Sequence, residues 1–500
     1  MAASLVATEA FAQGEGLPEK EGKPPIALGL EPGTPQVGTL PGGLTPAYGQ
    51  TAADEKDWRF DFHGFLTMPL RAGINKRAGT VTTEQQNVVL HAPPMVPDYI
   101  DSFNYTTVVP QPYVQLNFSY GNSVVTGNVI ILARTAATAA SFLDPPAESG
   151  ISDAFLNFRV PNLGSRAHLE MNVGVFTNRY GIMGEYDEGR YGTPVIARTK
   201  GAGENIVARF ALQKLTLDLE QGIQGQLDKP PNGILASGWN DFADQSQGTG
   251  FVNHLHAGAG YAGMATLGLH YVQAWTQDDR ASQGRLPDGS IRVLGADLRF
   301  TLGPYGHLYL VVSDAHAFNA HSVGGIIQVL NAPGGDGLMQ NYFGPNSGGT
   351  GSLLTFAGQY DLSIGKLLRG GAEFKGDSPD LVVSLFGMQT HVSSAEKDFD
   401  NVTKRKFGAE GGYSMLSWLA ASLRLDHVET NTSDSRDDFS IVSPRLIFRS
   451  KWQAHDQVVL QYSHFFNGSQ VHVRTGYPAV EDPTIHPDAD VVSLAASMWW

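Results

Sequence analysis

The chain has 500 residues, and 49 Asp and Glu against 34 Lys and Arg give it a formal net charge of −15. This acidic balance argues against a nucleic-acid-binding protein, which presents an excess of basic residues. Cys is absent, which excludes disulfide frameworks, Cys-ligated zinc, iron–sulfur clusters, covalent c-type haem and thiol catalysis. No apolar run is long enough for a helical membrane span. The length fits two or three soluble domains or one large closed barrel.

The N-terminal region differs in composition from the rest of the chain. Ala10-Phe11-Ala12 before Gln13 has the small–x–small form of a signal-peptidase site. It lacks the basic segment and long apolar core of a complete signal peptide, so we expect residues 1–12 to be a truncated remnant; a disordered soluble end is the alternative. Residues 13–56 are rich in Gly and Pro, which predicts a flexible periplasmic tail rather than a plug.

From residue 57 to residue 500, apolar and polar residues alternate. Side chains in a β-strand point to opposite faces in turn, so each such run predicts a two-faced strand. The runs are about 9–13 residues long, which is the length that crosses a bilayer at a tilt and exceeds the usual strand of a soluble sandwich. The clearest runs contain Phe60/Phe62/Leu66/Met68, Val114/Leu116/Phe118/Tyr120, Ala154/Leu156/Phe158/Val160, Leu169/Met171/Val173/Val175, Leu255/Ala257/Ala259/Tyr261 and Val458/Leu460/Tyr462.

Short and long breaks alternate between these runs. Eight short and nine long breaks separate 18 strands, which predicts an all-β, transmembrane, antiparallel up-and-down β-barrel with tight periplasmic turns and longer extracellular loops. The turn at Gln213–Lys214 rests only on a phase slip; without it and one neighbour the barrel would have 16 strands. The short breaks are Gly121–Ser123, Asn162–Ser165, Gln213–Lys214, Ala262–Met264, Leu302–Gly306, Ile364–Gly370, Met415–Ser417 and Lys451–His455, and the long ones include Asn178–Gly203 and Phe318–Thr350.

Tryptophan placement supports the same topology. Trp58, Trp418, Trp452, Trp499 and Trp500 all fall at the predicted periplasmic rim, where an aromatic girdle belongs. The last run alternates Val492, Leu494, Ala496 and Met498 and ends on the terminal Trp500.

With this C-terminal strand, the sequence resembles the Gram-negative outer-membrane porins, whose last strand ends in an aromatic residue recognised by the barrel-assembly machinery. The resemblance implies a cell outer-membrane location, contact with outer-membrane lipids and lipopolysaccharide, and passive diffusion of small hydrophilic solutes. Porins of this size resemble trimers, so a homotrimer is one open possibility. In porins the third outer loop folds inward and forms the constriction.

Charged residues alternate with the apolar ones, which predicts a hydrated interior. The third loop, Asn178–Gly203, has the rank, length and charge mixture of a constriction loop. We expect its acidic residues to face wall arginines across the pore; a surface loop held by its own charge pairs is the alternative. The constriction candidates are Glu185, Asp187, Glu188 and Arg190 on the loop and Arg159, Arg209 and Arg299 on the wall.

Other chemistry is weakly supported. His254 and His256 share a strand face and His270 could lie opposite them, but no carboxylate is adjacent in sequence, so no metal or other cofactor is expected. The Gly-rich segments near Gly334 and Gly344 lack the phosphate-loop Lys. No catalytic residue is identified and the protein is not expected to be an enzyme. The alternatives are a phospholipase-like barrel hydrolase and a structural or adhesive barrel with a plugged lumen.

Overall fold

The structure is a computed structural model. It describes residues 58–73, 109–110, 113–135, 147–183, 193–227, 249–277, 288–370, 379–450, 456–467 and 489–499, with gaps of one to four residues inside some of these ranges. The signal-peptide remnant and the tail predicted for residues 1–56 lie outside this part of the chain. Within it, no helix has the length and apolar character needed to cross a membrane.

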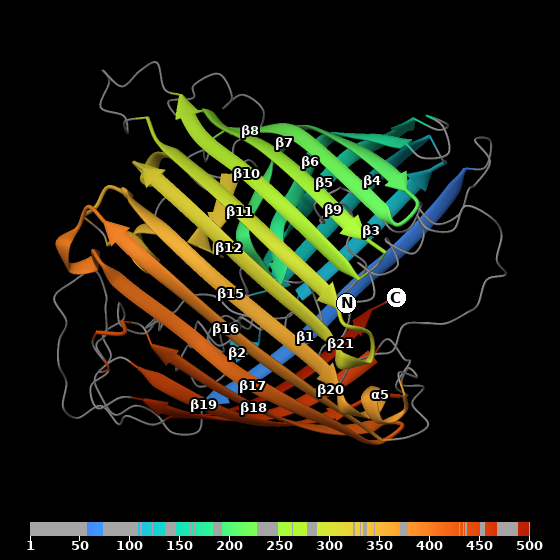
Figure 1. Ribbon diagram of the computed structural model, residues 1–500, viewed down its shortest axis with the longest axis vertical. Coiled ribbons are helices and arrows are strands. Elements are labelled where there is room, and N and C mark those ends of the chain that lie inside the picture. The colour runs from blue at the N-terminus through green and yellow to red at the C-terminus, as the bar shows by residue number, and fades with distance from the viewer. Residues whose placement is uncertain are drawn as a thin grey trace.

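The described residues form one 21-stranded sheet, which is almost the whole fold (Figure 1). Three of its strands are short and are additions to the main sheet: β2 (Val109–Pro110), β13 (Ile327–Val329) and β14 (Ala332–Pro333). The other 18 (21 − 3) are β1 (Arg59–Gly73), β3 (Tyr113–Gly121), β4 (Val125–Thr135), β5 (Ala147–Val160), β6 (Ala167–Met183), β7 (Thr193–Leu212), β8 (Leu215–Leu227), β9 (Thr249–Tyr261), β10 (Ala265–Gln277), β11 (Ser290–Thr301), β12 (His307–Phe318), β15 (Gly351–Ser363), β16 (Asp380–Ser394), β17 (Val402–Leu416), β18 (Leu419–Glu429), β19 (Phe439–Phe448), β20 (Asp456–Asn467) and β21 (Ala489–Trp499). The single α-helix in the described part is α5 (Ile364–Leu368), with short helical turns at Gly303–Tyr305, Ala320–Ser322, Met339–Phe343 and Lys397–Phe399.

Each main strand pairs antiparallel with the next main strand along the chain, and the pairing closes on itself. β1 pairs with β3 through Phe62 and Phe118, and it also pairs with β21 through Leu70 and Leu494. The last strand therefore hydrogen-bonds to the first. A closed ring has no free edge, so each of the 18 main strands has a partner on both sides.

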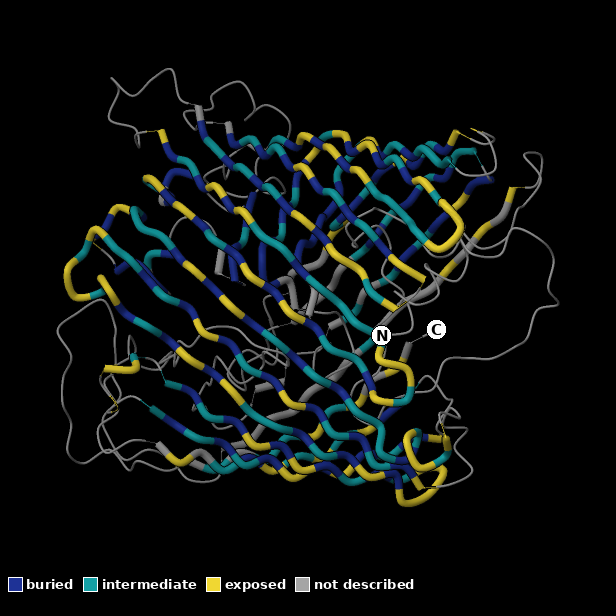
Figure 2. Tube along the Cα trace, in the orientation of Figure 1, coloured by how far each residue is buried: buried dark blue, intermediate teal, exposed yellow. Residues whose placement is uncertain are grey.

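Burial alternates along the strands as the sequence predicts (Figure 2). On β9, Leu255 is 45 % exposed, whereas His254 and His256 on either side of it are buried. The same contrast separates Leu156 from Asn157 on β5 and runs around the ring. The apolar face points outward and the polar face points into the barrel, which confirms the predicted strand faces.

The turn positions confirm 18 strands rather than 16. β7 ends at Leu212 and β8 starts at Leu215, so Gln213 and Lys214 form the turn that was predicted from a phase slip in the alternation. Gln213 has a φ of +52°, in the left-handed region used by tight turns. At the same short-turn end, Trp58 and Trp418 are exposed beside Tyr120 and Phe448, while Trp452 and Trp500 lie outside the described residues.

The segment expected as the third loop is mostly strand, and this corrects the sequence prediction. β6 continues to Met183 and β7 begins at Thr193. Pairing of β6 with β5 ends at Val175, and pairing of β7 with β8 ends at Ala202. The remainder, Phe176–Met183 with Thr193–Gly201, is a hairpin that leaves the wall; we call it the inserted hairpin.

The inserted hairpin is anchored inside the barrel. Gln224 of β8 donates a hydrogen bond to the Phe176 carbonyl (2.8 Å) and accepts one from Thr199 (2.7 Å). Tyr180 and Ile196 are fully buried and belong to a hydrophobic cluster with inward residues of β9 to β12, including Ile291. Because the inner wall is apolar here, the hairpin packs on it as a layer packs on a sheet.

The segment between β12 and β15 also packs inside the barrel, although it was expected as an outer loop. Its strand β13 pairs with β7 through Ile327–Thr199 and Gln328–Arg198, which extends the inserted hairpin. Val323, Leu338 and Phe343 join the same buried cluster. The barrel therefore contains its own small apolar core beneath its long-loop end.

Candidate functional site

Charged side chains of the inner wall are paired between neighbouring strands. Arg159 of β5 and Glu170 of β6 are register partners, with Nε and Oε1 3.4 Å apart. Arg209 of β7 and Asp218 of β8 are also register partners, with Nε and Oδ1 3.1 Å apart. Opposite charges that face each other directly on a sheet stabilise the pair and keep the wall polar.

The predicted wall arginines all lie on the inner face. Arg159 and Arg209 are buried, and Arg299 of β11 lies 3.8 Å from Asp297 and 5.9 Å from the centre of the Tyr309 ring. The loop candidates Glu185, Asp187, Glu188 and Arg190 lie outside the described residues. The predicted pairing of loop acids with wall arginines therefore stays a prediction.

A second group of inward charges lies on β17 to β19. Arg424 is fully buried and makes two hydrogen bonds of 2.8 Å to the Asp426 carboxylate, and its guanidinium lies 4.8 Å from the centre of the Phe386 ring. Arg445 donates to Glu410 at 3.1 Å. The bidentate Arg424–Asp426 pair and the Arg445–Glu410 pair give this side of the lumen a fixed charge pattern.

The inserted hairpin adds cations to the interior. Arg179 and Arg198 are register partners across the hairpin, on the face opposite Tyr180. Lys200 on the same face lies 3.4 Å from Asp153 of β5 and donates to Ser152 at 2.6 Å. The hairpin thus presents basic residues toward the side of the lumen away from β9–β12. The sequence placed Arg179, Arg198 and Lys200 in the third loop but not among the constriction candidates.

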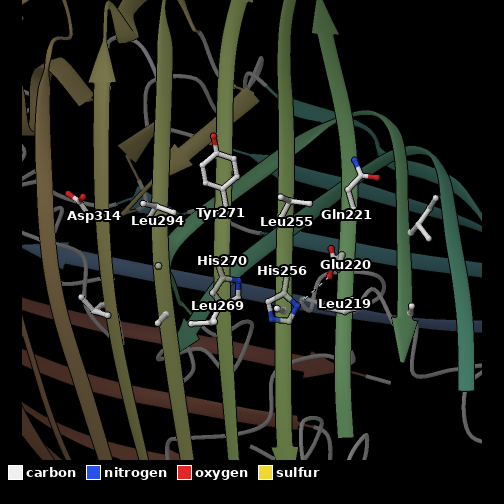
Figure 3. Close-up of a pocket in the computed structure, with 16 residues that line it drawn as sticks. Leu219, Glu220, Gln221, Leu255, His256, Leu269, His270, Tyr271, Leu294 and Asp314 are labelled. Carbon is white, nitrogen blue, oxygen red and sulfur yellow. Dashed lines mark ion pairs between the residues drawn. The ribbon is translucent and has the colours of Figure 1, made fainter. Parts of the chain in front are cut away.

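His254, His256 and His270 form a buried cluster on the wall beneath the hairpin. Figure 3 shows the last two beside Glu220. His256 of β9 and His270 of β10 are register partners whose rings stack with centres 4.6 Å apart. Glu220 of β8 lies 3.3 Å from His254 Nε2 and 3.9 Å from His256 Nδ1, and Asp297 of β11 is hydrogen-bonded to His270.

The carboxylates of the cluster come from β8 and β11, although no carboxylate is adjacent to these histidines in the sequence. Glu220 and Asp297 are far from them in the chain and adjacent through strand pairing. Because His254 and His256 lie two residues apart on one strand, the sequence alone predicts that their imidazoles are on the same face. The acids could be found only with the register of β8 and β11.

Glycines of the inner wall leave room for these side chains. A Cβ added at Gly268 would lie 2.6 Å from Asp297 Oδ2, and one added at Gly222 would lie 2.4 Å from His254 Cε1. A larger residue at either position would displace the cluster, so both glycines are required by close approach rather than by backbone conformation.

The outer wall over the same strands is apolar. A hollow there has Leu219, Leu255, Leu269 and Leu294 among its lining residues (Figure 3). All four side chains are exposed. An apolar outer surface therefore lies on the opposite side of the wall from the histidine cluster.

No protein-family model and no curated protein matches the chain. Among solved structures, it is similar to OpdK of Pseudomonas aeruginosa with vanillate, at 13 % identity and a TM-score of 0.43 over 88 % of this chain and 98 % of that one. It is also similar to the outer-membrane channel DcaP of Acinetobacter baumannii (11 % identity, TM-score 0.37, 90 % and 99 % covered) and to the outer-membrane protein OmpT of Vibrio cholerae (9 %, 0.38, 90 % and 100 %). The strand pairing of the chain itself establishes its fold: a closed, antiparallel, 18-stranded up-and-down β-barrel.

Proposed function

We propose that this protein is a porin-type channel of the outer membrane of a Gram-negative cell, through which small hydrophilic solutes diffuse passively. One observation carries the proposal: a closed 18-stranded ring has exposed leucines outside and buried charge pairs inside. Only closed barrels and helices satisfy all backbone groups in lipid. An apolar outer face with a charged inner one is the arrangement of a water-lined membrane barrel.

The inserted hairpin favours a narrow channel. Lumen-facing Asn157, Arg424 and Ser443 are each fully buried, and the hairpin packs inside the lumen against β9–β12. The other inward-facing strands carry guanidinium–carboxylate pairs on β17–β19 and amide groups such as those of Asn117 and Asn172 on β3–β6. Such a lining suits small polar solutes.

The proposal includes an orientation and partners. The short-turn end would face the periplasm and the long-loop end the exterior. Trp500 would be the residue recognised by the barrel-assembly machinery, and the leucine-rich outer wall would contact outer-membrane lipids and lipopolysaccharide. A homotrimer would use part of the same outer wall.

A proteoliposome-swelling assay tests the proposed function. Purified, heat-modifiable protein should admit small neutral sugars and exclude larger oligosaccharides, because the hairpin narrows the lumen. Liposomes with heat-denatured protein are the control. Equal exclusion of every solute by the folded protein would favour the closed structural barrel instead.

A second candidate function, ester hydrolysis, has one specific observation in its favour. His427 Nδ1 lies 2.8 Å from Ser440 Oγ, and His427 Nε2 lies 3.7 Å from Glu429 Oε1. A hydroxyl in contact with an imidazole that has a carboxylate on its other side is the arrangement of an activated nucleophile. All three face outward near the long-loop end, on β18 and β19.

Hydrolysis of short-chain nitrophenyl esters and of phospholipid, with and without calcium, decides this candidate. Ser440→Ala would abolish the activity, whereas Thr403→Val, which removes the similar contact of Thr403 with His391 (3.2 Å), would leave it unchanged. Equal rates for the wild type and Ser440→Ala would rule the site out.

A further inference from the structure

The inserted hairpin meets the barrel wall at the histidine cluster. The ring of Tyr180, which is fully buried, lies 5.5 Å from the His254 ring and 5.8 Å from the His270 ring. On the same face of β6, the Asn178 amide nitrogen lies 3.4 Å from His254 Nε2. The hairpin is therefore seated directly on imidazoles.

Charged and polar groups surround the imidazoles on every packed strand. Two carboxylates, Glu220 and Asp297, touch them, and each of these has a further polar partner: Asn205 donates to Glu220 at 3.0 Å and Arg299 lies 3.8 Å from Asp297. The groups facing the cluster are Asn178 and Tyr180 of β6, Asn205 and Arg209 of β7, Asp218 and Glu220 of β8, and Asp297 and Arg299 of β11.

We propose that His254, His256 and His270 position the inserted hairpin through their protonation state, and that acidification releases it from the wall. The proposal rests on the channel function in one respect, because the position of the hairpin then sets the conductance. Histidine is the side chain whose charge changes between about pH 5 and 8.

The charge count gives the direction of the effect. Asp218, Glu220 and Asp297 carry three negative charges, and Arg209 and Arg299 carry two positive ones. The first imidazolium is therefore neutralised, and each further proton on the cluster adds an uncompensated charge. The stacked rings of His256 and His270 repel each other when both are charged, and the cluster is buried beneath Tyr180, where an unpaired charge is poorly solvated. Movement of the hairpin away from β9 and β10 would admit water and relieve both effects.

Distances between spin labels test the proposal without relying on conduction. The wild-type chain has no Cys, so Arg198→Cys on the hairpin and Leu385→Cys on the outer face of β16 give two unique labelling sites. Between about pH 7.5 and about pH 4, well above and well below the ordinary imidazole pKa, the label distance should shift and its distribution should broaden. Identical distributions at both pH values would overturn the proposal.

Histidine variants separate the cluster from other titrating groups. In His254→Gln/His256→Gln/His270→Gln the shift should disappear, and in the single variant His270→Gln, which serves if the triple variant does not fold, it should be reduced. The control His316→Gln alters an exposed histidine paired with Asp314 on the outer wall and should leave the shift intact. An unchanged shift in the cluster variants would also overturn the proposal.

Single-channel conductance then distinguishes the two proposals. We expect a change of about twofold or more between the two pH values in the wild type, and none in the triple variant. A pH-dependent label distance in a protein that never conducts would support the positioning role and refute the channel function. Conductance that is the same at both pH values, with a fixed label distance, would refute the positioning role alone.

Discussion

Ile196 of the inserted hairpin occupies the space directly above Gly295 of β11. A Cβ added at Gly295 would lie 2.5 Å from Ile196 Cδ1 and 2.9 Å from Cγ1. The pair shows how a wall position that lacks a side chain accepts an inserted element. A substitution at this one contact can therefore test how the hairpin is held against the wall.

Gly295→Val should displace the hairpin. Overpacking of a filled contact costs about 1–3 kcal/mol, so the urea midpoint of the folded barrel should fall and the single-channel conductance should change. Adding Ile196→Ala to Gly295→Val should restore most of the midpoint. A Gly295→Val protein with the stability and conductance of the wild type would contradict this packing.

Asp426→Asn should destabilise the barrel strongly. Arg424 is fully buried and both of its hydrogen bonds to Asp426 depend on the carboxylate charge, so we expect a loss of about 3–5 kcal/mol. Asp314→Asn, which alters an exposed pair with His316, should cost no more than about 1 kcal/mol. Equilibrium urea unfolding of both variants gives the comparison, and equal losses would show that burial is not the cause.

Leu255→Arg tests which surface faces lipid. This exposed position lies midway along β9, so an arginine there should reduce the stability in bilayers by about 2–4 kcal/mol, whereas Leu302→Arg at a short turn should cost about 0–1 kcal/mol. Folding yield into lipid vesicles, followed by gel mobility, measures both. If the two substitutions were tolerated equally well, the outer wall would not be a lipid-facing surface.

Arg198→Glu should shift ion selectivity toward cations. It replaces one of the basic residues that the hairpin presents to the lumen, and the field near a narrow passage sets which ion enters. Reversal potentials in a salt gradient should move in the cation-selective direction, while Arg292→Glu on the outer wall should leave them where they were. Reversal potentials that Arg198→Glu leaves unchanged would place Arg198 away from the conduction path.

The strands were predictable from the sequence because one rule covers most of the chain. The alternation of apolar and polar residues, such as Leu255 and His256, indicates which face of a strand points outward. Neighbouring residues in the sequence are enough to show it. The turn at Gln213–Lys214 was visible as a change of phase. The strand count therefore needed no long-range information.

The interior was not predictable in the same way. Strand β12 reads Leu308-Tyr309-Leu310-Val311-Val312, where both faces are apolar, and this loss of alternation is one sign of an internal core. The partners that cover Tyr309 and Val311 come from β6, β7 and the segment after β12. Such contacts between distant segments depend on register and insertion, which alternation does not encode.

The most direct test of the account is the conductance of the purified, folded protein in planar lipid bilayers. A closed barrel with a charged, hairpin-narrowed lumen predicts discrete, ohmic current steps that change size in Gly295→Val. Folded, membrane-inserted protein that gives no steps in either form would contradict it.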